Sequence, residues 1–153
     1  MKKISVALSA VFMLWACSPQ DENPQRGLSR LIIETSPAAE FMVETAQSSR
    51  EMRTGLMYRK SMPENQGMIF DVKTPRSITM WMKNTYIPLD IVFIGPDYKI
   101  SGIYKNAKPM SEKLISSPGD AAAVLELNAG SAEKHHLKKG LTVRHFIFQN
   151  EAK

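Results

Sequence analysis

Cysteine is nearly absent from this chain of 153 residues, in which Cys17 is the only one. A lone cysteine has no partner within its own chain, so an intramolecular disulfide is excluded. Common catalytic signatures are missing too: the sequence has no GxSxG, GxGxxG or GxxxxGKS/T motif, and no Ser, His and Asp in a triad order. These absences favour a binding protein over an enzyme, although they name no ligand.

A strong charge of one sign is also absent. The chain carries 20 basic and 15 acidic residues, and the loss of residues 1–16, which include two lysines and no acid, leaves 18 against 15. This weak and dispersed charge does not favour nucleic acid as a partner. The densest basic run, "KHHLKK" at residues 134–139, is more typical of a solvated helix end than of a binding patch.

Metal-ligand spacing is not found either. The three histidines, His135, His136 and His145, lack the spacing of a zinc site. Thioethers can bind copper(I), but Met80 and Met82 on one face of an expected strand are more simply explained as core. We therefore predict no metal site and no cofactor.

The first residues have the pattern of a secretory signal. Lys2 and Lys3 precede an apolar run over residues 4–15, which is too short to be typical of a permanent membrane-spanning helix. The run ends in "LWAC", which resembles the lipobox of bacterial lipoproteins, with Leu14 three positions before Cys17 and the small Ala16 just before it. This resemblance implies cleavage before Cys17 and lipid on its thiol and on the new amino group.

The signal also predicts a location. Residues 17–27, "CSPQDENPQRG", are polar with two prolines and are typical of a flexible tether. We expect an exported protein that is anchored to the membrane of the cell envelope through its lipid. Ser18 follows the cysteine in place of the aspartate associated with inner-membrane retention, so the resemblance favours the periplasmic face of the outer membrane in a Gram-negative host.

Short β-rich runs dominate residues 28–153, which we interpret as a single domain. Its 43% hydrophobic and 23% charged residues are typical of a globular protein. Eight runs are expected to be strands: residues 30–35, 40–46, 67–72, 77–82, 89–94, 98–104, 122–128 and 142–149. With two short helices, starting near residue 48 and at residues 129–140, this pattern predicts a mainly β fold, a sandwich or barrel.

The first helix has a defined start and an unusual glycine. Ser48 followed by Glu51 is a capping-box pattern, and Met52 and Leu56 fall on one helix face. Gly55 within the helix costs about 1 kcal/mol relative to alanine. We expect a compensation, either a close approach to the sheet or the end of the helix.

Four blocks of sequence stand out between residue 41 and about residue 143. Their residues are Arg53, Gly55, Leu56, Met57 and Arg59; Gly67, Met68 and Phe70; Trp81, Met82, Asn84, Thr85, Pro88, Leu89, Asp90 and Phe93; and Leu125, Glu126 and Gly130. In this order they resemble the Domain of Unknown Function 192 family. The resemblance implies an exported, jelly-roll-like β domain and no agreed activity or catalytic residues. Val72 and Met80 replace aromatic residues common in the family, which we interpret as core adjustments.

Asp90 is the one polar residue of an expected strand, residues 89–94, that is apolar on both faces. A buried carboxylate is costly unless it is paired or hydrogen-bonded. Its candidate partners are Arg53, Arg59, Lys83 and the amides of the loop at residues 84–87. In the simpler interpretation Asp90 and Asn84 only hold this loop in place.

The sharper interpretation is a pocket between residues 53–59 and 81–90. Trp81 would be its apolar wall, and Asn84, Asp90 and an arginine its polar contacts. Such a site would bind a small ligand or a protein partner of the envelope.

Glu126 leaves an enzymatic alternative open. In "VLELN" it is most simply a solvent-facing strand residue. If it met Asp90 across a cleft, the two carboxyl groups could act as acid and base on a glycosidic bond of an envelope polymer. A third alternative is an assembly accessory that binds no small ligand.

Overall fold

The computed structural model describes residues 27–149. The expected signal peptide, the expected lipidation site at Cys17 and the expected tether lie outside these residues. Within the described range no helix is long and apolar enough to cross a membrane.

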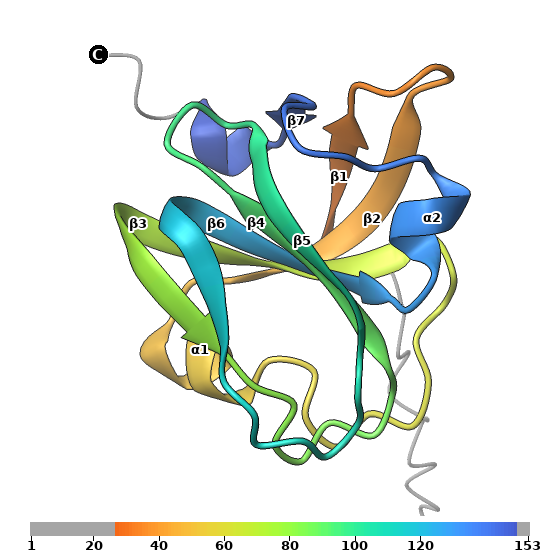
Figure 1. Cartoon of the computed structure of the whole chain (residues 1–153), viewed down its shortest axis with the longest axis vertical. Helices are drawn as coiled ribbons and strands as arrows, with labels where there is room; N and C mark the ends of the chain where they lie inside the picture. The colour runs from red at the N-terminus through yellow and green to blue at the C-terminus, as the bar shows by residue number, and fades with distance from the viewer. Residues whose placement is uncertain (1–26, 150–153) are drawn as a thin grey trace, which may run out of the picture.

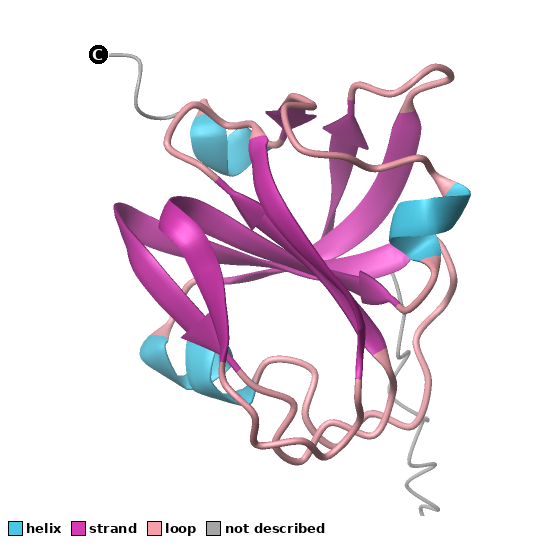
Figure 2. Ribbon diagram, viewed as in Figure 1, coloured by secondary structure: helices cyan, strands magenta, loops and turns pink. Residues whose placement is uncertain are grey.

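Within residues 27–149, seven strands form one curled sheet, a half-barrel, and two short helices pack beside it (Figure 1; Figure 2). The strands are β1 (Leu28–Ile33), β2 (Ala39–Ala46), β3 (Gln66–Met80), β4 (Leu89–Ile94), β5 (Ile100–Ala107), β6 (Ile115–Asn128) and β7 (Val143–Arg144). The helices are α1 (Ser49–Thr54), α2 (Ser131–Lys134) and the 3-10 turn η1 (Phe146–Phe148). The predicted mainly β fold is confirmed.

The strand order across the sheet is β5-β4-β6-β3-β2-β1-β7. Neighbouring strands are antiparallel except β2 and β3, which are parallel and are joined through α1. A parallel pair needs a crossover connection, and this connection places α1 over one face of the sheet.

The long strands β3 and β6 bend together. Asp71 pairs with Ala123, but the next pair along the ladder is Arg76 with Ala121, so β3 carries extra residues at this point. Such bulges bend a strand and increase its twist. The far half of this antiparallel pair therefore folds down toward α1 (Figure 1), and it faces this helix across the end of the sheet.

The two edges of the sheet are connected at one end. Lys99, just before β5, forms an isolated antiparallel bridge with Thr142, just before β7. The Val143 amide donates to the Tyr98 carbonyl at 2.9 Å. This contact joins the edges of the half-barrel at that end.

Apolar side chains fill both faces of the sheet. One cluster, which includes Val92 and Leu125, packs against α2 and the C-terminal segment. The other includes Ile91 and Val124, and Met52 of α1 packs against it. Because every side chain of β4 is buried, this strand is central, as the sequence predicted.

Several expected elements differ from the observed ones. The helix expected at residues 129–140 is reduced to Ser131–Lys134. The runs at residues 67–72 and 77–82 are one bent strand, because the ladder with β6 resumes after the bulge. The last expected strand is reduced to Val143–Arg144, and η1 follows it. Strand β6 begins at Ile115, before the expected residue 122, because it follows β3 around the bend.

Candidate functional site

The first wall of the candidate site is α1 and the turn after it. Ser48 and Glu51 form the predicted capping box, in which the Glu51 amide donates to the Ser48 side chain and Glu51 accepts from the Ser48 amide. Gly55 ends the helix with a φ of 47°, a conformation that glycine adopts readily.

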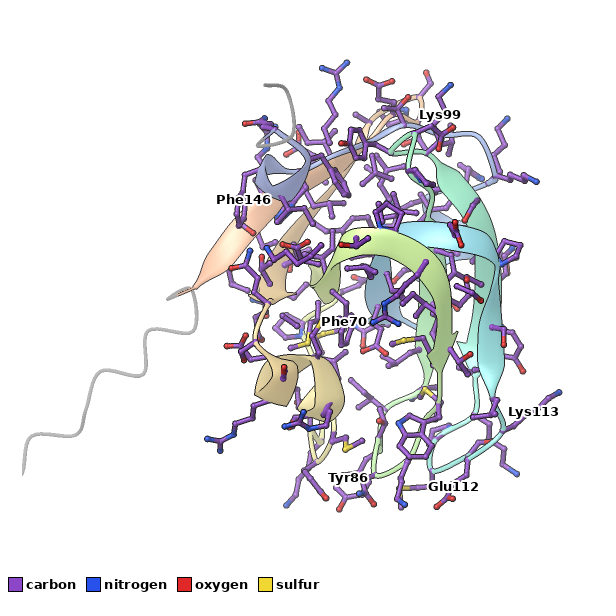
Figure 3. All side chains as sticks on the ribbon, turned by 90° about the vertical axis from the view of Figure 1, so that its left-hand side faces the viewer. Phe70, Tyr86, Lys99, Glu112, Lys113 and Phe146 are labelled. Atoms are coloured by element: carbon purple, nitrogen blue, oxygen red, sulfur yellow. The ribbon has the colours of Figure 1, made fainter. Side chains whose placement is uncertain are left out.

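Gly55 also makes a close approach to the sheet. A Cβ atom at this position would lie 3.0 Å from Phe70 Cζ and 3.8 Å from Glu126 Oε2. Figure 3 shows Phe70 in the interior, close to α1 and inside the bend of β3. Both expected compensations for this glycine are therefore present: it ends the helix, and it lets the backbone approach the sheet.

A cavity of about 350 Å³ lies between this wall and the end of β3. Its lining comes from three parts of the chain: α1 with the turn after it, the two ends of β3 with the residues that follow, and one residue of β6. The lining residues are Met52, Arg53, Thr54, Gly55, Leu56, Met57, Phe70, Thr79, Met80, Trp81, Thr85 and Glu126. A second hollow of about 190 Å³ shares five of them and continues along α1.

Glu126 is the carboxylic acid of this cavity. It pairs across the sheet with Met68 of β3 and Ile91 of β4, so its side chain points to the face that α1 covers. The residue is 4% exposed, and its carboxyl group makes no hydrogen bond within residues 27–149. Burial raises the pKa of Glu126 to about 8, against the opposing effect of the Arg59 guanidinium. At neutral pH the group is therefore mostly protonated, and it can donate or accept a hydrogen bond.

Arg59 lies near Glu126 but is already paired. It forms a bidentate ion pair with Glu44 of β2, with Nη2 to Oε2 at 2.7 Å. This pair raises the pKa of the guanidinium and satisfies its charge. Arg59 therefore does not line the cavity, and its ion pair stabilises the chain beside it.

Trp81 and Arg53 line the outer part of the cavity. Trp81 is 42% exposed, and the ammonium group of Lys83 lies 5.2 Å from the centre of its ring. Arg53 is exposed and has no ion pair or hydrogen bond within the described part of the chain. An aromatic side chain and an unpaired guanidinium thus line the side of the cavity nearest to solvent.

Asn84 is outside the cavity and holds its rim. Its side-chain amide donates to the Tyr58 hydroxyl at 2.9 Å, and its carbonyl accepts from the Tyr58 amide at 2.8 Å. Its φ of 55° is a left-handed conformation that asparagine tolerates well. This matches the simpler interpretation of the residue, a structural role in the loop.

Asp90 is fully buried, as expected, but its partners are not the expected ones. Its Oδ1 accepts from the Asn106 amide at 2.9 Å, and its Oδ2 accepts from the Ala132 amide at 2.8 Å. The first partner belongs to a bulge of β5, where Asn106 has a φ of 53°. The second is in the first turn of α2. The N-cap residue of this helix, Gly130, has no side chain that could accept a hydrogen bond from the first-turn amides. No arginine of the first helix takes part.

Asp90 and Glu126 do not meet. Glu126 is opposite Ile91, one position further along β4, and side chains alternate along a strand, so the two carboxyl groups lie on opposite faces of the sheet. They cannot act together on one glycosidic bond. Among residues 27–149, no group of three or more His, Cys, Asp or Glu side chains could hold a metal ion.

Several residues of the site were not predicted from the sequence. Met57, Phe70, Thr79 and Thr85 line the cavity, although their pattern indicates only core or loop residues. One signal in this region was Gly55, for which we expected either a close approach to the sheet or the end of the helix. The apolar neighbours of Glu126 would have indicated burial, but alternation along the strand suggested exposure.

Comparison with known proteins gives a family and two solved structures. The model of the family DUF192, described as "Uncharacterized ACR", matches residues 31–145. A crystal structure from Sinorhizobium meliloti, described as a candidate transcription regulator, is 38% identical, with a TM-score of 0.75 over 78% of this chain and 95% of its own. A protein of unknown function from Novosphingobium aromaticivorans is 36% identical, with a TM-score of 0.75 over 77% and 85%. No curated protein sequence matches this chain.

Proposed function

The chain belongs to the Domain of Unknown Function 192 family, and we propose that it binds a small, mostly apolar ligand in the cavity between α1 and the bent end of β3. Glu126 is the polar contact at the base of the site, and Trp81 and Arg53 contact the ligand further out. The observation that carries this proposal is the buried carboxyl group of Glu126, which lines the cavity without a hydrogen-bond partner in the described residues.

The carboxyl group makes no hydrogen bond with the rest of the described chain and faces the cavity, so its hydrogen bonds have to come from whatever occupies the cavity. A ligand that donates or accepts one hydrogen bond would satisfy Glu126. The apolar lining, with Met52, Met57 and Phe70, suits the rest of such a molecule, because methionines adapt to irregular shapes. A cavity that is mostly apolar with few polar groups is the usual form of a small-molecule site.

We further propose that this domain works in the cell envelope. The lipobox-like "LWAC" sequence and the polar residues after it support a lipid anchor at Cys17. In a Gram-negative host the domain would face the periplasm from the outer membrane. A protein partner of the envelope remains the second candidate for the site, and the exposed Trp81 on the cavity wall favours it.

Native mass spectrometry of the protein purified from its own host tests the ligand. We expect a bound small molecule on the wild-type protein, and we expect Glu126→Leu to lose it because the hydrogen bond at the base of the cavity is gone. Glu133→Leu, an exposed substitution on α2, is the matched control and should keep the molecule. A molecule retained by Glu126→Leu, or none on the wild type, would contradict the proposed function.

The stability of Glu126→Leu is a second measurement. Replacing an acid that has no partner in the protein by an apolar side chain of similar size should be neutral or stabilising by about 1–3 kcal/mol. A variant that loses the ligand but gains stability would identify Glu126 as a residue kept for binding.

A further inference from the structure

Exposed apolar side chains are concentrated at one end of the molecule. Residues 57–61, 81–88 and 108–114 form this surface, which we call the loop end. Seven large apolar side chains are exposed among residues 27–149, and five of them belong to it: Tyr58, Trp81, Tyr86, Met110 and Leu114. Figure 3 shows Tyr86 at this end, together with Glu112 and Lys113, and Phe146 near the opposite end. A patch of this kind on a soluble face indicates an interaction.

The three segments of the loop end are joined by direct contacts. The rings of Tyr58 and Tyr86 pack edge to face with centroids 6.2 Å apart. The Met110 amide donates to the Thr85 carbonyl at 3.0 Å, and the Met82 amide donates to the Ser111 carbonyl at 2.9 Å. The loop end is therefore one connected surface.

The backbone at this end is held in uncommon conformations. Tyr58 and Met110 have φ values of 66° and 61°, in the left-handed region that such side chains rarely adopt. Residues of this kind persist only where the surrounding structure fixes them, and they cluster at functional sites. Both side chains are exposed, so packing in the core does not explain why the backbone is strained here.

The charge of the loop end is basic. The loop end contains one acid, Glu112, and four lysines, Lys60, Lys83, Lys108 and Lys113. Glu112 forms an ion pair with Lys83 at 3.7 Å. The remaining cation, Arg59, is neutralised by Glu44 of β2. Lysine is depleted at protein interfaces, whereas tyrosine, tryptophan and lysine together are typical of groups at a membrane surface.

We propose that the loop end docks on the anionic surface of a lipid bilayer. The exposed tyrosines, Met110 and Leu114 enter the headgroup region, and the lysines lie beside the lipid phosphates. The anchor proposed at Cys17 would keep the domain close to a bilayer, so even a weak contact would be occupied. The contact through the loop end can be tested without the lipid anchor, because the domain without its N-terminal segment contains every residue of the loop end.

The test uses residues 27–153, without the lipid. The relative from Sinorhizobium meliloti is matched over 95% of its length, so a chain that is almost wholly this domain folds on its own. Co-sedimentation with vesicles of phosphatidylglycerol and phosphatidylcholine should show binding that high salt weakens, and vesicles of phosphatidylcholine alone should bind less. Trp81, the only tryptophan of this fragment, should shift its emission to the blue on binding.

Matched substitutions at the two ends decide the proposal. The pair Lys108→Gln and Lys113→Gln, and the pair Tyr86→Ser and Leu114→Ser, should each weaken partitioning about tenfold or more. Lys99→Gln and Phe146→Ser, away from the loop end (Figure 3), should leave it unchanged, with thermal unfolding confirming that every variant is folded.

Three results would overturn the proposal. The first is that the fragment does not bind the anionic vesicles. The second is that Lys99→Gln and Phe146→Ser weaken binding as much as the substitutions in the loop end. The third is that the emission of Trp81 shifts with protein concentration when no vesicles are present. The last result would assign the loop end to a second copy of the chain. None of them bears on the cavity at Glu126, which native mass spectrometry tests separately.

Discussion

Asp90 and Glu126 lie on opposite faces of one sheet, although their strands are hydrogen-bonded neighbours. Asp90 accepts two backbone amides, from Asn106 and Ala132, and so connects a bulge of β5 with the first turn of α2. Glu126 has no such partner in the described residues, and it lines a cavity. The first carboxyl group therefore stabilises the fold, and the second is available for a ligand.

The raised pKa of Glu126, about 8 against 4.5, predicts a stability that falls as the pH rises. Below about pH 4.5 the group is protonated in both states and contributes no pH dependence. Between about pH 4.5 and 8 the unfolded chain releases its proton and the folded chain keeps it, so stability falls by up to about 1.4 kcal/mol per pH unit. Above the folded pKa this loss is complete.

Urea unfolding of the wild type and of Glu126→Gln at several pH values measures this effect. Glutamine does not titrate, so the variant should lack the decline, and Glu133→Gln, the exposed control, should retain it. Burial lowers the pKa of His145 from 6.5 to about 4. Its contribution to stability is therefore lost only as the pH falls from about 6.5 to 4. Above pH 6.5 His145 does not interfere, so the effect of Glu126 is best measured there. Equal slopes in the wild type and Glu126→Gln would contradict the buried, protonated carboxyl group.

The two amide contacts of Asp90 predict a large loss of stability on truncation. Hydrogen bonds to a charged group contribute about 1.5–3 kcal/mol each, so Asp90→Ala should lower the free energy of unfolding by about 3–5 kcal/mol. Asp90→Asn keeps one acceptor oxygen and should cost less. Asp97→Ala, which removes an exposed acceptor of the Lys99 amide in a turn, is the control. An unchanged midpoint in urea for Asp90→Ala would refute the assignment.

The close approach of Gly55 to Phe70 predicts a coupled pair. Gly55→Ala places a methyl group 3.0 Å from Phe70 Cζ at a φ of 47°, so we expect a cost of about 1–3 kcal/mol. Phe70→Leu should relieve the steric part and leave the backbone part, so the cost of Gly55→Ala should be smaller in the Phe70→Leu background. A double-mutant cycle measures this difference, and strictly additive costs would show that the contact is unimportant.

The sequence predicted the fold class because alternation and turn residues act locally. It identified β4 as a central strand, the capping box of α1 and the requirement at Gly55. It did not predict that residues 66–80 form one strand, because the bend depends on pairing with β6, almost fifty residues later. Such partners are set by tertiary packing, which a single sequence does not display.

The candidate site could be predicted only in part, for the same reason. Trp81, Arg53 and Glu126 line the cavity, whereas Asn84 and Arg59 support it from outside and Asp90 lies on the other face. Which face a residue of β4 or β6 occupies depends on the register between the two strands. A shift of β4 by one residue relative to β6 would place Asp90 and Glu126 on the same face of the sheet.

The anchor at Cys17 remains a prediction, and cell fractionation checks it. Cys17→Ser should release the protein from the membrane fraction or leave an uncleaved precursor, because no thiol is available for the lipid. Ser18→Ala is the control and should remain in the membrane. Stable anchoring needs two or more acyl chains, so a Cys17→Ser protein that is processed and still partitions into detergent like the wild type would exclude lipidation.

Trp81 gives the last prediction, because it distinguishes a site at the surface from a residue of the core. The side chain is 42% exposed and lines the cavity beside Arg53. In residues 27–153 its fluorescence should therefore be quenched readily by acrylamide, and Trp81→Ala should cost about 1 kcal/mol or less, as surface substitutions do. A core tryptophan would resist quenching and would cost about 3–5 kcal/mol through the cavity it left behind. Asn84→Ala, which removes the contact with Tyr58 but none with the indole ring, should lower stability slightly and leave the emission unchanged. A protected Trp81 with a costly truncation would place this side chain in the core and remove the outer wall of the proposed binding site.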